Sequence, residues 1–381
     1  MPHRRDRYRK AVDLRGHVIA VAAASVLFLV AAKGAHAQPL PDEGLQTIID
    51  SSVRGGVPGV ALCVETWDGK VWSGAAGTTA VDNPQPVTPD MPFRLFGLSK
   101  LAIAALALTL VDDAELALDD SIGQWIDLAL IQNLPHAHEI TIRDLIAQTS
   151  GIRDYLDEEF VFMTRAEPGR KWRPEELVAR AAEGEPFSAP DPEVSYDSHT
   201  NYVLLGLAIE RAGNAPLAQQ LEERIFKPLG MTSTHSWESM AEPSPVHGHV
   251  PQFMVRIDVS DIDLSMAWGG GGLLSTAEDV AKMTRGIFEG NLLSGNSRAL
   301  MTENFRPLDD EEAEYGYGTI RFLSYEPSPI GYSGEGIGFG AVTAWWPETG
   351  LIVVVLTNLQ AEAHLGILEG VANAVASHRS P

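Results

Sequence analysis

The stretch of residues 91–110 (MPFRLFGLSKLAIAALALTL) combines polar groups that could do chemistry with a long apolar run. We predict an extended entry over residues 91–95 and then a helix whose first turn carries Gly97, Ser99 and Lys100. The amino terminus of such a helix presents unpaired backbone N–H groups and a partial positive charge, which suit negative charge developing on a substrate oxygen. A helix that is apolar all round is also what a domain centre usually buries, so this stretch alone leaves both interpretations open.

Other chemistry-bearing patterns are sparse. The single cysteine, Cys63, lies in an apolar run, which favours core packing and excludes an intramolecular disulfide. The eleven histidines follow no metal-ligand spacing, and the glycine run at residues 269–272 lacks the Lys-Ser/Thr ending of a phosphate loop. The sequence therefore predicts no metal site and no cofactor.

Periodicity predicts strands near both ends of the chain and helices between them. A helix over residues 42–55 precedes strands 60–66 and 70–75, which are joined by the strong turn signal Asp68-Gly69. Further helices are predicted over residues 121–128, 142–148, 174–182, 202–212, 216–226 and 275–288. Later strands are predicted over residues 317–323, 341–346 and 351–357, with a final helix over residues 363–376.

This order of elements predicts an α/β (α+β) fold. We expect strands from both chain ends to form one antiparallel sheet lobe, made of about residues 42–110 and 310–378. We expect about residues 111–309 to form an all-α lobe that packs against this sheet.

Residues 1–37 differ from the rest of the chain. Basic residues precede an apolar run over residues 18–32, and Ala35-His36-Ala37 fits cleavage before Gln38, so we predict a secretory signal peptide, with an uncleaved anchor as the alternative. We then expect an exported protein, periplasmic or secreted, of residues 38–381, without a stable membrane span. The net charge of the full chain is −23 and becomes −28 after cleavage, which argues against nucleic acid and anionic lipid as partners.

Six segments carry a more specific signal, and they are Phe93–Lys100, Thr141–Tyr155, Thr200–Glu210, Phe226–Thr234, Gly271–Met283, and GYSGEG followed by WWPETGLIVVVLTN, ending at Asn358. In this order they resemble the serine β-lactamase-related family, which includes class C β-lactamases, D-alanyl-D-alanine carboxypeptidases and related esterases. The resemblance spans residues of about 42–378. It implies the β-lactamase/DD-peptidase-like fold, with an active site between the sheet domain and the all-α domain.

The family's Ser-x-x-Lys motif places a serine nucleophile one helical turn before a lysine that activates it. In this chain Lys100 holds the lysine position, and Gly97 stands where the serine is expected. Ser99 is a poor substitute, because it points about 100° away around the helix. The resemblance therefore implies that the nucleophile is missing.

The family's second element supplies a tyrosine just before the segment that begins at Thr200. Counting back without a gap places His199 third, Ser198 second and Asp197 at the tyrosine position. A one-residue insertion would instead bring Tyr196 there, and this alternative stays open. Each residue is also compatible with an ordinary polar loop.

The family's third element, Lys-Thr-Gly or His-Ser/Thr-Gly on the strand that lines the cleft, is here Tyr332-Ser333-Gly334. A phenol therefore replaces the basic residue. The backbone N–H groups of Gly97 and Glu335 correspond to the family's oxyanion hole, so the resemblance implies that a cleft persists.

Three hypotheses follow. The first is a non-acylating homologue that binds a peptide, muropeptide or ester-like ligand, or a partner protein, in the cleft. The second is a hydrolase or acid/base enzyme that uses Lys100, Asp197 and Tyr332 on ester, amide or β-lactam-like substrates, against which stands a Lys100–Asp197 ion pair that only neutralises the lysine. The third is a serine hydrolase with a substitute hydroxyl such as Ser99 or Ser198. The sequence does not determine the oligomeric state.

Overall fold

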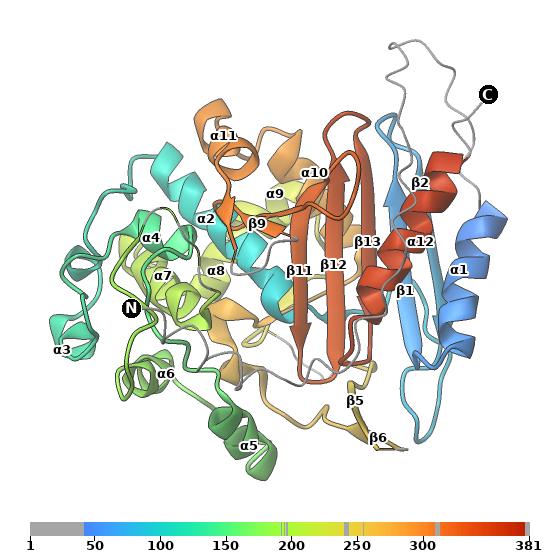
Figure 1. Ribbon diagram of the computed structural model, residues 1–381, viewed down its shortest axis with the longest axis horizontal. Coiled ribbons are helices and arrows are strands. Elements are labelled where there is room, and N and C mark those ends of the chain that lie inside the picture. The colour runs from blue at the N-terminus through green and yellow to red at the C-terminus, as the bar shows by residue number, and fades with distance from the viewer. Residues whose placement is uncertain are drawn as a thin grey trace, which may run out of the picture. The chain divides into compact units, whose positions relative to one another are not determined.

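The computed structural model describes residues 42–191, 193, 195, 197–239, 244–253, 255–308 and 313–377 (Figure 1). The predicted signal peptide, residues 1–37, and the candidate Tyr196 lie outside these residues. In the part of the chain that is described, no helix is long and apolar enough to cross a membrane.

An eight-stranded antiparallel sheet runs through the molecule in the order β2-β1-β13-β12-β11-β10-β9-β8. Its strands are β1 (Gly59–Glu65), β2 (Val71–Gly77), β8 (Arg306–Pro307), β9 (Ala313–Tyr315), β10 (Ile320–Phe322), β11 (Ile330–Gly336), β12 (Phe339–Trp346) and β13 (Leu351–Thr357). Strand β1 pairs with β13, so strands from the two ends of the chain lie side by side in the sheet. The predicted α/β fold with an antiparallel sheet from both chain ends is confirmed.

The two faces of the sheet pack against different helices because side chains alternate along each strand. Val60, Leu62 and Val64 of β1 belong to an apolar cluster with residues of α1 (Asp42–Arg54) and α12 (Ala363–Ser377), which lie side by side on that face (Figure 1). Ala61 and Cys63 belong to the larger cluster on the other face, together with α2 (Ser99–Asp112) and α10 (Ala277–Phe288). Burial raises the pKa of Cys63 to about 12, which fits the predicted packing role.

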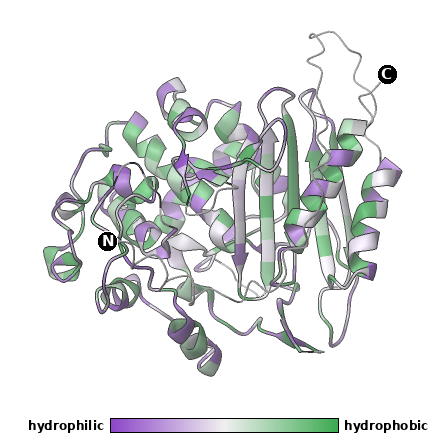
Figure 2. Cartoon of the chain, in the orientation of Figure 1, coloured by the Kyte–Doolittle hydropathy of each residue, from purple (hydrophilic) through white to green (hydrophobic). Residues whose placement is uncertain are grey.

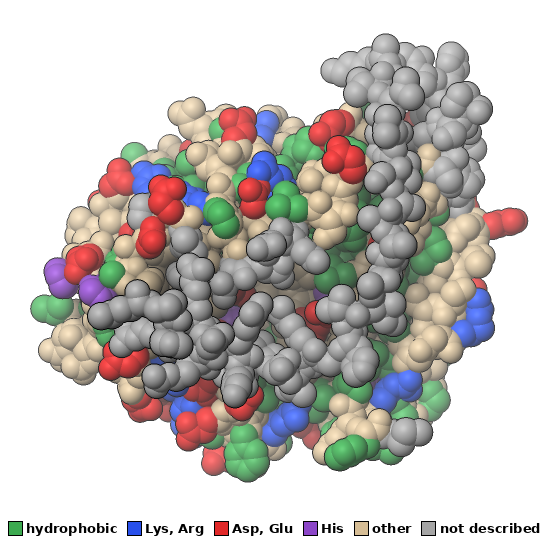
Figure 3. Space-filling model, viewed as in Figure 1, with side chains coloured by type: hydrophobic (Ala, Val, Ile, Leu, Met, Phe, Trp, Pro, Cys, Tyr) green, Lys and Arg blue, Asp and Glu red, His purple; other side chains and the backbone are tan. Residues whose placement is uncertain are grey.

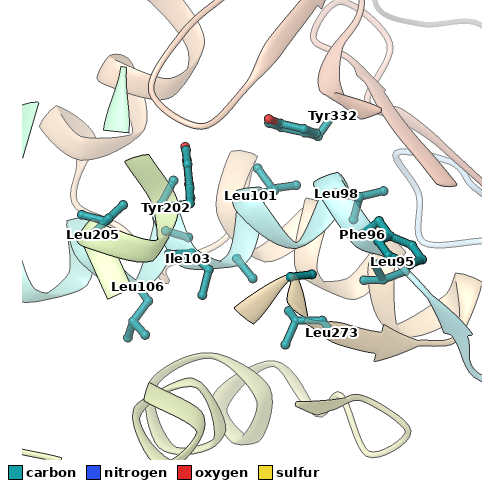
Figure 4. Close-up of a cluster of buried hydrophobic side chains, with 14 of the residues drawn as sticks. Leu95, Phe96, Leu98, Leu101, Ile103, Leu106, Tyr202, Leu205, Leu273 and Tyr332 are labelled. Atoms are coloured by element: carbon teal, nitrogen blue, oxygen red, sulfur yellow. The ribbon is translucent and has the colours of Figure 1, made fainter. Parts of the chain in front are cut away.

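Helix α2 is the most completely enclosed helix segment of this core. Every residue from Ser99 to Leu110 is buried, and its leucine and isoleucine side chains contact neighbours on all sides (Figure 4). Figure 2 shows the central strands mostly green and white, whereas outer helices such as α5 (Glu158–Ala166) carry purple positions. The burial predicted for an all-apolar helix is therefore present.

The remaining helices lie mostly between the strands in sequence. They are α3 (Leu128–Ile131), α4 (Ile142–Ile146), α5 (Glu158–Ala166), α6 (Pro174–Ala181), α7 (His199–Ala212), α8 (Leu217–Leu221), α9 (Lys227–Leu229) and α11 (Gly295–Glu303). The small β3 (Phe93–Arg94), β7 (Leu273–Ser275) and β4 (His235–Ser236) form a second sheet, and β5 (His249–Gln252) and β6 (Val255–Asp258) form a hairpin. Of these elements, α3, α5, α9, α11 and the strands β4, β5, β6 and β7 were not predicted, whereas β3 lies within the extended entry predicted over residues 91–95.

Three predicted helices are wrong in part. Residues 121–128 form only a 3-10 turn over Ile122–Gln124, because Asp127 caps a new helix by accepting from the Ala129 N–H. The helix predicted over residues 142–148 ends at Ile146, since Gln148 adopts a left-handed φ of 60°. The helix predicted over residues 216–226 changes after Leu221 into a π-helical segment.

Two further boundaries differ from the prediction. The strand expected over residues 317–323 is shortened to β10, because Gly318 takes a φ of 72° in a turn before it. Gly97 lies in a 3-10 turn over Phe96–Leu98 rather than in the first turn of α2. Phe96 has a left-handed φ of 43°, which prevents the α-helix from starting earlier.

Candidate active site

Lys100 and Asp197 form an ion pair at the amino-terminal end of α2. The Lys100 Nζ lies 2.5 Å from Asp197 Oδ1, and the side-chain exposures are 1% and 52% respectively. The Lys100 Nζ also lies 5.8 Å from the centroid of the Tyr202 ring. A buried ammonium is therefore neutralised by a carboxylate that remains half open to solvent.

Gln148 holds the same carboxylate oxygen from a second direction. Its Nε2 donates to Asp197 Oδ1 at 2.7 Å, and its Oε1 accepts from the Ser198 N–H at 3.2 Å and from Asn201 Nδ2 at 2.5 Å. The left-handed φ of Gln148 accompanies a fully buried side chain. Such backbone strain at a polar network is typical of positions that the surrounding structure holds firmly.

The charge state of Asp197 follows from two opposing effects. Partial desolvation of the carboxyl favours the protonated form, but the positive charge of Lys100, with a smaller effect of His199, outweighs it. The pKa of Asp197 therefore lies below its ordinary value, and the carboxylate is ionised at neutral pH.

His199 and Ser198, the other two residues predicted in this segment, lie in different surroundings. His199 Nδ1 lies 2.9 Å from Asp154 Oδ2, and its backbone N–H donates to Asp154 Oδ1 at 3.1 Å. The Ser198 hydroxyl is fully buried and has no hydrogen-bond partner in the described part of the chain. Although both residues follow Asp197 in the chain, His199 is hydrogen-bonded to Asp154, and the Ser198 hydroxyl points into the protein interior.

Tyr332 begins a chain of buried phenols. Its hydroxyl lies 3.4 Å from that of Tyr315, which lies 3.0 Å from that of Tyr202, and the Tyr202 hydroxyl donates to the Ile146 carbonyl at 3.1 Å. Tyr332 and Tyr202 lie on the same side of α2 (Figure 4). Burial, with the negative charge of Asp197, raises the pKa of Tyr332 well above its ordinary value, so this phenol is neutral.

Gly97 lies directly against β11. A Cβ added to Gly97 would lie 3.2 Å from the Cα of Gly334 and 3.8 Å from Cε1 of Tyr332. A Cβ added to Gly334 would lie only 2.3 Å from the Leu98 nitrogen and 2.8 Å from the Gly97 nitrogen. The two backbone segments predicted to supply oxyanion-hole N–H groups, at Gly97 and Glu335, are thus adjacent only because Gly334 has no side chain.

Ser333 faces the opposite side of β11 from Tyr332. It pairs across the strands with Val342 of the α12-facing cluster, and its Oγ lies 3.0 Å from Nε2 of His364. Burial lowers the pKa of His364 to about 4, so its imidazole is neutral at pH 7. Glu335 is exposed on this same side, where partial desolvation and the charge of Glu362 raise the pKa of its carboxyl to about 7. The structure therefore does not bring Ser333 and Glu335 side chains together with Tyr332.

Ser99 is turned away from the ion pair. Its hydroxyl is 1% exposed and accepts a hydrogen bond from the Leu273 N–H at 3.2 Å. This placement agrees with the rotation around the helix that its position in the sequence predicts.

Several residues that support the site were not predicted, namely Gln148, Asn201, Tyr202, Tyr315, His364 and Ser150, whose hydroxyl donates to Asn201 Oδ1 at 2.5 Å. Gln148, Ser150, Asn201 and Tyr202 all lie within segments that carry the family resemblance, which was the available signal. Tyr315 and His364 carry no local signal, because their contacts depend on strand pairing and on the docking of α12.

Among the described residues, no group of three or more His, Cys, Asp or Glu side chains is arranged to hold a metal ion.

Comparison with known proteins identifies the class. The model of the family described as Beta-lactamase matches residues 37–376, so the chain belongs to the β-lactamase family of serine hydrolases and penicillin-binding proteins. A relative from Bacillus subtilis (strain 168), named as penicillin-binding protein PbpX, is 25% identical over 281 residues, which are 73% of this chain and 65% of that protein. Penicillin-binding protein 4 of Amycolatopsis lactamdurans is 26% identical over 334 residues, 79% of this chain and 81% of that protein.

The fold is shared with a solved enzyme structure. The D-amino acid amidase of Ochrobactrum anthropi SV3, complexed with L-phenylalanine amide, superposes with a TM-score of 0.78 at 23% identity, covering 89% of this chain and 99% of the amidase. This likeness supports the predicted β-lactamase/DD-peptidase-like fold.

Proposed function

We propose that this chain is an exported, non-acylating member of the β-lactamase family that binds a small peptide-like or ester-like ligand beside Lys100. The observation that carries the proposal is Gly97, which offers no nucleophile at the position three residues before Lys100. Loss of a nucleophile removes most of the rate of acyl transfer, because only binding and oxyanion stabilisation remain.

The state of Lys100 supports the same proposal. Its ammonium is buried and bound to an ionised carboxylate, whereas a lysine that activates a hydroxyl has to accept a proton. The neutral phenol of Tyr332 occupies the position of a basic residue. By the resemblance, Gly97, Asp197 and Tyr332 thus stand in place of the serine, the tyrosine and a basic residue, and Lys100 is paired with one of them.

One solved structure of the same fold supports a small ligand. The Ochrobactrum amidase has been solved with an amino acid amide, which is a small molecule with an amine and an amide group. We propose a ligand of similar size for this chain, taken up after export directed by residues 1–37.

A second candidate function is hydrolysis with a substitute hydroxyl. It is favoured by the hydrogen bond between Ser333 and His364, since a serine within 3.0 Å of a neutral imidazole is the geometry of an activated nucleophile. His364 Nδ1 in turn lies 3.3 Å from the Ala361 carbonyl, which can orient the ring. The other enzymatic alternative is an acid/base enzyme that uses Lys100, Asp197 and Tyr332.

Covalent labelling distinguishes the two functions. We expect that neither a fluorescent penicillin nor a fluorophosphonate modifies the wild-type protein. A label that disappears in Ser333→Ala and His364→Ala would instead establish the substitute hydroxyl, and turnover that collapses in Lys100→Ala would establish the acid/base enzyme.

Restoring the nucleophile tests the non-acylating proposal from the other side. Gly97→Ser alone should gain little hydrolysis of a chromogenic cephalosporin or p-nitrophenyl ester, because Lys100 stays bound to Asp197. The double variant Gly97→Ser with Asp197→Tyr should gain more, since it frees the amine and restores the phenol. Equal activity of the single and double variants would contradict this role of Asp197.

A further inference from the structure

The Asp197 carboxylate is held by the protein through one oxygen. Lys100 Nζ and Gln148 Nε2 both donate to Oδ1, at 2.5 and 2.7 Å. Among the described residues no hydrogen bond reaches Oδ2. Because an ionised carboxylate offers about four acceptor positions, half of its capacity stays unused on the Oδ2 side.

The exposure of the two partners indicates where this free capacity lies. Lys100 is 1% exposed and Asp197 is 52% exposed, so the protein covers the Oδ1 side and solvent reaches the rest of the carboxylate. The next side chain, Ser198, adds a fully buried hydroxyl without a partner in the described residues. Of these two neighbouring groups only the Asp197 carboxylate is open to solvent, so it is the one that a ligand can reach.

The charges around Asp197 favour a cation over an anion. Lys100 has its ammonium buried and already paired, so it is not available to bind a ligand carboxylate. The phenols of Tyr202, Tyr315 and Tyr332 feel the negative charge of Asp197 and are neutral. The chain carries a net charge of −23, and acidic side chains are spread over the described surface in Figure 3. An anionic group would be repelled, whereas a cation would be attracted.

The geometry also selects among cations. A guanidinium binds best to both oxygens of a carboxylate at once, but Oδ1 already accepts from two donors. A primary ammonium is a compact donor that binds a single oxygen well.

We propose that Asp197 Oδ2 recognises the protonated primary amine of a small ligand, such as an amino acid amide or a short peptide. This inference rests on the proposed ligand-binding function and names its ligand chemistry. In this arrangement Lys100 and Gln148 are positioning residues that orient the carboxylate, and Asp197 contacts the ligand.

Calorimetric titration of the full chain tests the proposal with matched probes. D-phenylalanine amide and D-alanyl-D-alanine carry an α-amine, and Nα-acetyl-lysine amide carries only a side-chain amine. N-acetyl-D-phenylalanine amide and 3-phenylpropanamide lack a basic amine. We expect at least one amine probe to bind about tenfold more tightly than the probes without an amine, as one charge-assisted hydrogen bond provides.

Variants locate the effect. Asp197→Asn should abolish the preference for the amine, and Asp197→Glu should retain part of it. Asp119→Asn is the matched control, because Asp119 is 82% exposed and its loss changes the net charge equally at an ion pair with Arg143. The preference for an amine is measured on the wild-type protein alone. The test therefore does not depend on the stability of Asp197→Asn.

The outcomes separate this inference from the proposed function. Preference for the α-amine or for the side-chain amine supports the proposal and identifies the source of the amine. Equal binding of amine and non-amine probes, or no binding of any probe at millimolar concentration, overturns it. A wild-type protein that is labelled by fluorophosphonate overturns the non-acylating function and leaves the amine preference measurable.

Discussion

The two faces of strand β11 place polar pairs in opposite surroundings. On the α2 face, Tyr332 lies near the charged Lys100–Asp197 pair, and one partner of that pair is half exposed. On the α12 face, Ser333 forms a neutral hydrogen bond with His364, which is 1% exposed. One strand therefore carries an ionised, solvent-reachable site on one side and an uncharged, nearly closed pair on the other.

This difference follows from how a protein accommodates buried polar groups. A buried cation needs a partner of opposite charge, and Asp197 is that partner for Lys100. A buried imidazole can lose its charge instead, and His364 does so because burial lowers its pKa to about 4. The open charged pair is the site of the proposed ligand, whereas the closed neutral pair joins α12 to the sheet.

The largest expected effect comes from adding a side chain where β11 contacts the turn before α2. Gly334→Ala places a Cβ 2.3 Å from the Leu98 backbone nitrogen, so a backbone shift is required, and we expect a loss of about 3 kcal/mol in the free energy of unfolding. Gly97→Ala is the matched control: its Cβ meets Gly334 at 3.2 Å and its φ is not left-handed, so its stability should stay within about 1 kcal/mol of wild type. Chemical denaturation measures both, and equal losses would contradict the asymmetry of this contact.

The α12 face should be sensitive to acid through His364. Unfolded imidazole takes up a proton near pH 6.5, but the folded group does so only near pH 4, so the free energy of unfolding falls as the pH drops through this window. The contribution of this residue should reach about 3 kcal/mol by pH 4. Glu335 contributes with the opposite sign, since its raised pKa of about 7 stabilises the fold as the pH falls.

A comparison of wild type with His364→Gln isolates the histidine. Between pH 7 and pH 4, the free energy of unfolding of the wild type should fall more than that of His364→Gln, as measured by denaturation at each pH. A constant difference would mean that His364 is not held neutral by burial.

The α2 face should respond unequally to loss of either ion-pair partner. Asp197→Leu leaves a buried ammonium unpaired and should cost about 2–3 kcal/mol, less than for a fully enclosed pair because water can reach this side. Lys100→Met leaves a carboxylate that solvent can hydrate, and should cost less than about 1 kcal/mol.

The contribution of the Lys100–Asp197 ion pair to the free energy of unfolding should depend on pH. The pKa of Asp197 is lowered, so its stabilising effect is present above the ordinary carboxyl pKa of about 4 and is lost as the pH falls through the folded value. The stability difference between wild type and Lys100→Met should therefore shrink in acid. Denaturation midpoints at neutral and acidic pH check this, and a difference that grows in acid would contradict the pairing.

The smallest expected effect belongs to Ser333. Ser333→Ala leaves Nε2 of His364 without its hydroxyl partner, at a cost of about 1 kcal/mol, which is the ordinary net contribution of one hydrogen bond. Ser328→Ala, which removes a hydroxyl donating to the Tyr325 carbonyl at 3.0 Å, is a matched control on a loop. Thermal or chemical denaturation should rank Ser333→Ala as the more destabilising of the two.

Much of the fold could be predicted from local patterns. The strands β1, β2 and β13, the helix α1 and the apolar helix α2 lie close to their predicted positions because each has a clear periodicity or composition. Boundaries failed where one residue adopts an unusual backbone angle, as at Phe96, Gln148 and Gly318. Such angles are stabilised by distant contacts and leave little trace in the sequence.

The candidate site was likewise predicted only in part from the sequence. Lys100, Asp197 and Tyr332 were named from motif positions, and the structure brings Lys100 and Asp197 into contact. Tyr196 lies outside the described residues, so the choice between it and Asp197 for the family's tyrosine position stays a prediction. The orientation of Ser333 and Glu335 toward α12 could not be derived from the motif, since it depends on the pairing of β11 with β12.

By itself the sequence determined the family, the antiparallel sheet from both chain ends, the buried helix α2 and the absence of a side chain at position 97. Only the tertiary structure decided that Lys100 pairs with Asp197, 97 positions away, that three phenols form a chain, and that Ser333 meets His364. The physical reason is range. Periodicity and residue type act over a few neighbouring positions, whereas the charge state and accessibility of a side chain depend on what the folded chain packs around it.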